Sequence, residues 1–140
     1  MASIFTQIIE GKIPGHFVWK DDTAIAFMTI QPIRDGHLLV IPRLEIDHWD
    51  DLPTEIMTHL FQVCQKITKG LKKAFPATRV GMIIAGLEVP HTHIHLLPVD
   101  NLSDFDFANT HNATSEELAI NAEKIRNELT ALGYKETICQ

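Results

Sequence analysis

The sequence predicts an α+β fold of about five strands, mostly in hairpin-like succession, with two long helices covering one face of the sheet. Short runs of β-forming residues, separated by turn signals, occupy much of the first two thirds of the chain. In two longer segments apolar residues recur at three- and four-residue steps, as they do along one face of a helix. Of the 140 residues, 45% are hydrophobic and 21% are charged, which is typical of a globular chain with a packed core.

Turn residues separate the expected strands. Asp21-Asp22 lies between the first two, which indicates a hairpin, and Asp35-Gly36 precedes the third. The segment Gly86–Pro90 interrupts the extended pattern between the last two. The predicted strands cover residues 17–20, 23–28, 37–42, 79–85 and 91–99.

Three helices are expected from periodicity and end signals. A short one covers residues 3–10 and ends at Gly11. A long one begins at Pro53-Thr54 and stops at Pro76. Its apolar face consists of Ile56, Leu60, Val63, Cys64, Ile67 and Leu71.

The third helix follows a polar segment over 100–112 that we expect to be a loop with two isolated phenylalanines. Thr114 and Glu117 form a capping-box pattern at its start, and Gly133 suits its end. One side of this helix carries Leu118, Ala122, Ile125, Leu129 and Leu132.

Length and composition restrict what the protein contacts. We expect one domain over residues 1–140, with a core at about 3–99 and a C-terminal loop and helix over 100–140. The net charge of −6 argues against a nucleic-acid partner, which would need a basic face. The apolar stretches are too short to span a membrane, and no secretory signal is visible, so a cytoplasmic protein is expected. Cys64 and Cys139 do not make a disulfide framework.

Three histidines alternate with other residues at positions 91, 93 and 95. On a strand, residues two apart point to the same face and lie roughly 6.6–7 Å apart, so His91, His93 and His95 would share one surface. Neighbouring imidazoles repel when charged, which lowers their pKa values. Two kinds of chemistry fit this pattern: a zinc site with an open position, or attack on phosphorus by a neutral imidazole. The spacing alone leaves both open.

The run 91–97 resembles the motif of the histidine triad family, in which three histidines alternate with apolar residues and two apolar residues follow. The block Gly36–Pro42, with the pattern Gly-His-x-x-Val-Ile-Pro, strengthens the resemblance. Coverage runs from about residue 3 to residue 99. Further matching blocks, in the expected order, lie at 8–14, 26–27 and 86–90.

This resemblance implies a five-stranded antiparallel sheet, usually in a homodimer whose two sheets join edge to edge. It also implies chemistry on the phosphate of a small-molecule nucleotide, with no metal and no other cofactor. His93 matches the nucleophile and His95 the donor of a hydrogen bond to phosphate. His91 matches the residue that orients the nucleophile, and His37 the one that supports it. Apolar positions that pack around the base match Ile4, Phe5, Phe27 and Ile30.

Several residues depart from the family pattern. Thr29 stands where an Asp usually binds the ribose hydroxyls, and a threonine cannot bind both as a carboxylate does. Leu87 and Glu88 stand where Gln and Ser or Thr usually help to hold the phosphate; we still expect Thr29 and Glu88 to face the nucleotide. Some relatives bind a structural zinc through two cysteines and a histidine. The matching positions here are Ser3, Thr6 and Glu45, so no metal is expected.

Three hypotheses follow. The first is a hydrolase or transferase that forms a nucleotidyl-histidine intermediate from nucleoside phosphoramidates, adenylates or dinucleoside polyphosphates. The second, suggested by Thr29, Leu87 and Glu88, is a regulatory module that binds a nucleotide but turns it over poorly. The third is a metal-dependent hydrolase that uses the three histidines at 91, 93 and 95.

Overall fold

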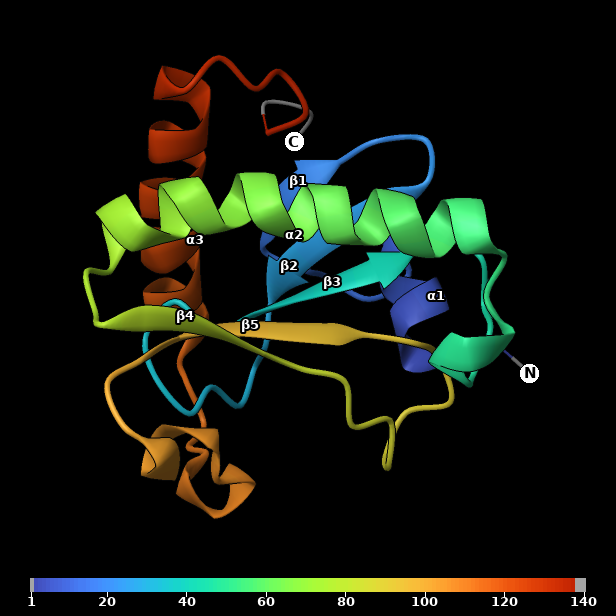
Figure 1. Ribbon diagram of the computed structural model, residues 1–140, viewed down its shortest axis with the longest axis horizontal. Helices are drawn as coiled ribbons and strands as arrows, with labels where there is room; N and C mark the ends of the chain where they lie inside the picture. Colours follow the sequence, from blue (N-terminus) through green and yellow to red (C-terminus); the bar gives the residue numbers. More distant parts are fainter. Residues whose placement is uncertain (1, 138–140) are drawn as a thin grey trace.

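Five strands form one sheet in the computed structural model, which describes residues 2–137 (Figure 1). Their order is β1-β2-β3-β5-β4, and every neighbouring pair is antiparallel. The expected five-stranded antiparallel sheet is therefore confirmed. The strands are β1 (Phe17–Lys20), β2 (Ala24–Met28), β3 (Leu38–Pro42), β4 (Arg79–Ile83) and β5 (Ile94–Val99).

The two long helices, α2 (Thr54–Ala74) and α3 (Ser115–Ala131), lie on one face of the sheet, as expected. Figure 1 shows α2 lying across the strands and α3 at a steep angle beside it. The short α1 (Ile4–Ile9) packs on the opposite face. No helix in the described part of the chain is long and apolar enough to cross a membrane.

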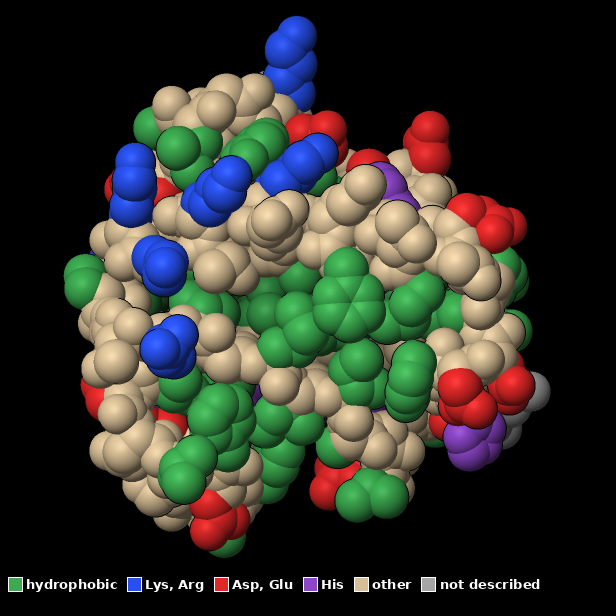
Figure 2. Space-filling view, in the orientation of Figure 1, with side chains coloured by type: hydrophobic (Ala, Val, Ile, Leu, Met, Phe, Trp, Pro, Cys, Tyr) green, Lys and Arg blue, Asp and Glu red, His purple; other side chains and the backbone are tan. Residues whose placement is uncertain are grey.

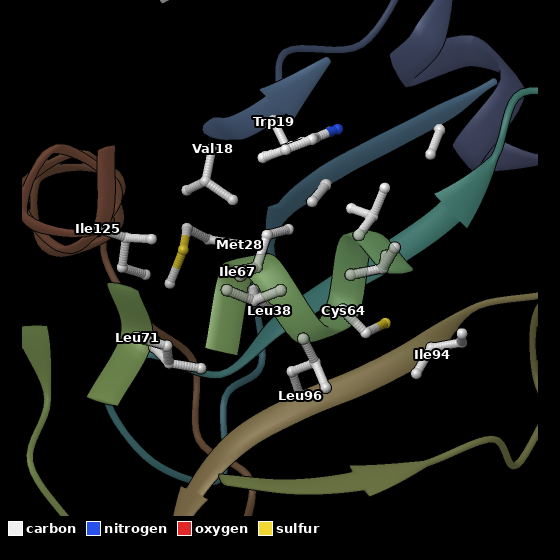
Figure 3. Packing of buried hydrophobic residues seen from close by; sticks show 14 of the residues in the cluster. Val18, Trp19, Met28, Leu38, Cys64, Ile67, Leu71, Ile94, Leu96 and Ile125 are labelled. Carbon is white, nitrogen blue, oxygen red and sulfur yellow. The ribbon is translucent and has the colours of Figure 1, made fainter. Parts of the chain in front are cut away.

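The core between the sheet and the long helices combines inward-facing strand residues, most of them at alternate positions, with the apolar sides of α2 and α3. Burying one such aliphatic side chain contributes roughly 1.5–3 kcal/mol, so this layer supplies much of the stability. Cys64 is a buried free thiol within it, whereas Cys139 lies outside the described residues. Figure 3 shows members of this layer, among them Val18, Met28, Leu38, Cys64, Ile67, Leu71, Ile94, Leu96 and Ile125.

The opposite face of the sheet has its own apolar cluster, in which Phe5 and Ile8 of α1 pack against the strands. Ser3 caps α1, because its hydroxyl accepts a hydrogen bond from the Thr6 N–H at 3.1 Å. The strand residues of this cluster are Ile25, Phe27, Leu39 and Ile41. Its position is important because the histidines of the motif lie beside it.

Some boundaries differ from those that the sequence predicts. The strand expected over 91–99 begins only at Ile94, because the backbone N–H groups of His91 and Thr92 donate to Val89 and Ile46 instead of a neighbouring strand. The strand expected over 79–85 ends at Ile83. Leu132, expected on the buried side of α3, is its C-cap and is 37% exposed.

The polar segment 100–112 is more ordered than the expected loop. It contains two short 3-10 helices, η2 (Leu102–Phe105) and η3 (Phe107–Asn109), and a third, η1 (Trp49–Asp51), precedes α2. Asp104 closes η2 in a capping box with Asn101. Such short-range hydrogen bonds are not visible in a pattern of hydrophobicity, which is why the segment was expected to be irregular.

Candidate active site

The four matched histidines gather at the middle of the sheet and are all buried. His95 lies on β5 opposite Leu39 of β3, and His37 immediately precedes β3. Ring centroids of His95 lie 5.1 Å from His93 and 5.2 Å from His37. His91 and His93 belong to the segment before β5, so only His95 occupies the strand on which all three were expected.

The hydrogen bond of His93 determines which of its nitrogens is free to react. Its Nδ1 lies 2.7 Å from the carbonyl oxygen of His91, and a carbonyl oxygen can only accept. Nδ1 must therefore carry the proton. In the neutral ring this leaves a lone pair on Nε2, which is the nitrogen that can act as a nucleophile.

A chain of hydrogen bonds gives His95 the other neutral tautomer from that of His93. The backbone N–H of Ile33 donates to Nδ1 of His37 at 3.0 Å, so neutral His37 carries its proton on Nε2. That Nε2–H lies 2.9 Å from Nδ1 of His95 and donates to it. Neutral His95 therefore carries its proton on Nε2, and this N–H can donate to a ligand oxygen.

Burial keeps the rings of His37, His91 and His95 neutral near pH 7. Burial lowers the pKa of His37 to about 4. Burial, together with the nearby rings of His37 and His93, lowers the pKa of His95 to about 3. The pKa of His91 is also lowered, chiefly by burial, although its hydrogen bond to Pro42 opposes the shift. The neutral tautomers assigned to His37 and His95 are consequently the relevant forms.

His91 is bonded to the protein through both ring nitrogens. Its Nε2 lies 2.8 Å from the Pro42 carbonyl, and its Nδ1 lies 2.8 Å from the hydroxyl of Ser3. Thr6 and Glu45 complete a small polar cluster around Ser3. No lone pair of His91 remains for a metal, so a site formed by His91, His93 and His95 together has no support in this geometry. Among the described residues, no group of three or more His, Cys, Asp and Glu side chains is placed to hold a metal ion.

The structure brings some of the expected nucleotide-binding residues to the histidines and leaves others at the surface. Phe5 is buried, with ring centroids 5.0 Å from His93 and 5.6 Å from Phe27. Thr29 is half-buried and accepts a hydrogen bond from the Gln31 N–H at 3.3 Å. Ile4, Ile30 and Glu88 are exposed, with Ile30 69% exposed.

Phe107 is a residue of this region that sequence reasoning missed. Its ring centroid lies 4.9 Å from His95 and 6.5 Å from His37, and 39% of its surface is exposed. Arg34 fixes the segment that carries it, through ion pairs of 2.8 Å to Asp100 and 3.0 Å to Asp104. The signal was an isolated phenylalanine in a polar segment, which by itself does not indicate a contact with the histidines.

Comparisons with known proteins identify the family of this chain. The family model described as HIT domain matches residues 10–102. A Saccharomyces cerevisiae protein named adenosine 5'-monophosphoramidase HNT1 is 33% identical over 69% of this chain and 62% of its own length. A Schizosaccharomyces pombe protein named bis(5'-nucleosyl)-tetraphosphatase (asymmetrical) is 33% identical over 66% of this chain and 54% of its own.

Solved structures give the same answer for the fold. The crystal structure of a Hit-like protein from Bartonella henselae superposes with a TM-score of 0.80 at 34% identity, covering 90% of this chain and 95% of that one. Such a score over nearly the whole of both chains indicates the same arrangement of strands and helices.

Proposed function

Because this chain belongs to the HIT domain family, in which relatives are named as nucleotide hydrolases, we propose that it cleaves or transfers the phosphate group of a nucleotide through a nucleotidyl-histidine intermediate. The observation that carries this proposal is the hydrogen-bond order of the histidines. It leaves a lone pair on Nε2 of His93 and a proton on Nε2 of His95, and these two rings are neighbours.

The proposed reaction has two steps. In the first, Nε2 of His93 attacks the phosphorus, an N–P bond forms, and the bond to the leaving group breaks; the leaving group takes up a proton from the solvent. In the second, water attacks the phosphorus and releases a proton to the solvent, the N–P bond breaks, and His93 is regenerated with its lone pair on Nε2. His95 donates a hydrogen bond to a phosphoryl oxygen as charge develops there. His37 holds the proton of His95 in place, and His91 orients His93.

The proposed substrates are nucleoside phosphoramidates, adenylates or dinucleoside polyphosphates, and the names of the two yeast relatives support the first and last of these classes. The base would pack on Ile4, Phe5, Phe27 and Ile30, with Thr29 and Glu88 close to the ribose and phosphate. We also propose that residues 1–140 form one domain, since Leu118, Ala122, Ile125 and Leu129 of α3 belong to the same core as α2.

The second candidate function is binding with little turnover. It is favoured by the loop 86–90, in which Leu87 is 92% exposed and Glu88 is exposed as well. Neither side chain supplies a hydrogen-bond donor to a phosphate, and the charge of Glu88 would repel one. Tight binding of AMP in calorimetry, together with no product over hours, would favour this candidate over the first.

Replacement of the nucleophile tests the proposed chemistry. His93→Ala should lower kcat for an adenosine phosphoramidate by at least about 10³-fold, because no other neutral imidazole there has a free lone pair. In the unmodified protein, mass spectrometry of a quenched reaction should find AMP attached to His93. His48→Ala is the control, since this exposed histidine lies outside the cluster. Turnover by His93→Ala at the normal rate would refute the mechanism, and loss of activity on chelation would favour a metal enzyme.

We further propose a homodimer formed through the α2 side of β4, which is an edge strand of the sheet. A groove of about 940 Å³ runs there, and Figure 2 shows hydrophobic side chains gathered along it. Asp50 lies at one end of the groove and Lys69 and Lys72 at the other. A second copy related by a two-fold axis would pair these opposite charges. Apolar residues of the groove include Trp49, Leu52, Met57, Phe61 and Met82.

A further inference from the structure

We propose that Ser3, Thr6 and Glu45 act as positioning residues for the nucleophile, by anchoring His91 and with it the carbonyl group that sets the tautomer of His93. This proposal rests on the proposed function for its catalytic consequence. Its structural content concerns the positions where some relatives bind a structural zinc, which here carry a hydrogen-bonded cluster instead.

Ser3 is the centre of the cluster, and its hydrogen bonds have defined directions. Its hydroxyl accepts from the Thr6 N–H, and its own single proton is directed to Nδ1 of His91 at 2.8 Å. Nε2 of His91 faces the Pro42 carbonyl at 2.8 Å, and that oxygen can only accept. Both contacts require the same neutral tautomer of His91, so the ring is held from both sides.

Glu45 fixes Ser3 and Thr6 to the loop that follows β3. One oxygen of its carboxylate, Oε1, accepts both the Ser3 N–H at 2.7 Å and the Thr6 hydroxyl at 2.6 Å. These two hydrogen bonds keep the pKa of Glu45 below its usual value. The cluster therefore joins the start of α1, the loop after β3 and the segment before β5. Ser3 is 42 positions from Glu45 and 88 positions from His91 in the sequence.

The consequence for catalysis passes through one backbone group. The carbonyl of His91 takes the Nδ1 proton of His93 at 2.7 Å, and this leaves the lone pair on Nε2. If the ring of His91 loses its contact with Ser3, the Pro42 contact and the backbone hydrogen bonds of His91 and Thr92 remain, but the carbonyl is held less firmly and the two neutral tautomers of His93 become closer in energy. The tautomer with the proton on Nε2 has no lone pair for the attack.

Three variants test the proposal. Ser3→Ala and Glu45→Ala should lower kcat about 10-fold or more with KM changed less than twofold, because a nucleophile in the wrong state affects the chemical step rather than binding. Glu45→Gln should retain activity within about twofold of the unmodified protein, because one amide oxygen can accept both hydrogen bonds. Asp47→Ala is the matched control: Asp47 is also exposed, and only its backbone carbonyl contacts Thr92.

The tautomer itself gives a readout independent of turnover. In the unmodified protein, the ¹⁵N resonances of His93 should show the Nδ1–H form almost alone, whereas Ser3→Ala and Glu45→Ala should show a measurable Nε2–H population. Circular dichroism verifies that each variant is folded, since Ser3→Ala also removes a helix cap worth about 1 kcal/mol. An unchanged His93 tautomer in both alanine variants would overturn the inference. Changed tautomers with no turnover of any nucleotide by the unmodified protein would instead refute the proposed function.

Discussion

At the scale of single residues, His37 and His95 form a pair of imidazoles whose protonation states depend on each other. Each ring is buried, and one hydrogen bond of 2.9 Å joins them. Because the donor of this bond is fixed by the Ile33 N–H, a backbone group of the loop before β3 controls a proton on β5. Protonation of either ring would break this order, so the site is expected to lose its arrangement in acid.

This pair should make folding stability sensitive to pH. The folded-state pKa values of about 4 for His37 and about 3 for His95 lie below the ordinary value of 6.5, so the unfolded chain binds more protons between these values. Stability is fully present above about pH 6.5 and falls as the pH falls toward 3–4. In His37→Gln, the free energy of unfolding in urea should drop between pH 7 and 5 by about 1–2 kcal/mol less than in the unmodified protein.

The comparison has a matched control. His48→Gln removes an exposed histidine outside the pair and should keep the pH dependence of the unmodified protein. If His37→Gln shows the same loss between pH 7 and 5 as the unmodified protein, the buried pair does not contribute to acid sensitivity.

Phe107 supplies part of the burial of His95, since their ring centroids lie 4.9 Å apart. Phe107→Ala would admit water to His95 and should raise its pKa from about 3 by roughly one unit, because less desolvation opposes the charged form. An NMR titration of the imidazole measures this shift. Leu102→Ala, which changes an exposed side chain of the same segment, should leave the pKa of His95 unchanged. An equal pKa in Phe107→Ala would show that the ring does not shield the histidine.

At the scale of elements, the entry into β3 decides where His37 lies. Gly36 has a φ of +94°, a conformation that side chains with a Cβ rarely adopt. A Cβ there would also lie 2.9 Å from Phe75 Cδ2 and 3.1 Å from Leu71 Cδ1. The turn before His37 is thus packed directly against the end of α2, which joins the candidate active site to the helical layer.

Gly11 and Gly36 both have a positive φ, but an added Cβ would contact neighbouring side chains only at Gly36. Substitutions at the two positions therefore distinguish the free-energy cost of backbone strain from that of overpacking. Gly11→Ala should lose about 1–2 kcal/mol of unfolding free energy, because φ is +79° but the added Cβ meets nothing within 4 Å. Gly36→Ala should lose about 2–5 kcal/mol, because overpacking against Phe75 and Leu71 is added. Urea unfolding of both variants measures the difference. Equal losses of unfolding free energy in the two variants would mean that Phe75 and Leu71 shift to accommodate the added Cβ without destabilising the protein.

At the scale of the whole molecule, the two faces of the sheet have different tasks. The face under α2 and α3 holds the larger apolar core, whereas the other face carries α1, its aromatic residues and the histidines. Charge is also divided along α2: Figure 2 shows acidic side chains near the start of α2, at the right, and Lys and Arg side chains near its end. This division is what the proposed two-fold contact would use.

The proposed dimer gives a direct test. Sedimentation velocity of the unmodified protein at micromolar concentration should give twice the monomer mass, and Phe61→Glu should give the monomer, because a carboxylate would be buried at the centre of the apolar groove. Ile120→Glu changes a similarly exposed apolar residue on α3 and should remain dimeric. A monomer for the unmodified protein, or a dimer for Phe61→Glu, would contradict this interface.

The sequence by itself determined the elements and the central motif. Strands, helices and turns follow from local periods and from turn residues such as Asp21-Asp22 and Gly36, and these signals need only neighbouring residues. The alternation of His91, His93 and His95 was equally local. The alternation did not predict where the strand begins. It begins at Ile94, because the backbone N–H groups of His91 and Thr92 donate to Val89 in the preceding loop and to Ile46 rather than to a neighbouring strand.

Tertiary structure alone decided which residues control those histidines. Ser3 contacts both Glu45, 42 positions later in the sequence, and His91, 88 positions later. Phe107, which follows the motif in sequence, packs against His95. The protonation state of each ring likewise depends on burial and on partners such as Ile33 and Pro42. Contacts of this kind depend on how the loops close over the sheet, and no local period in the sequence records that closure.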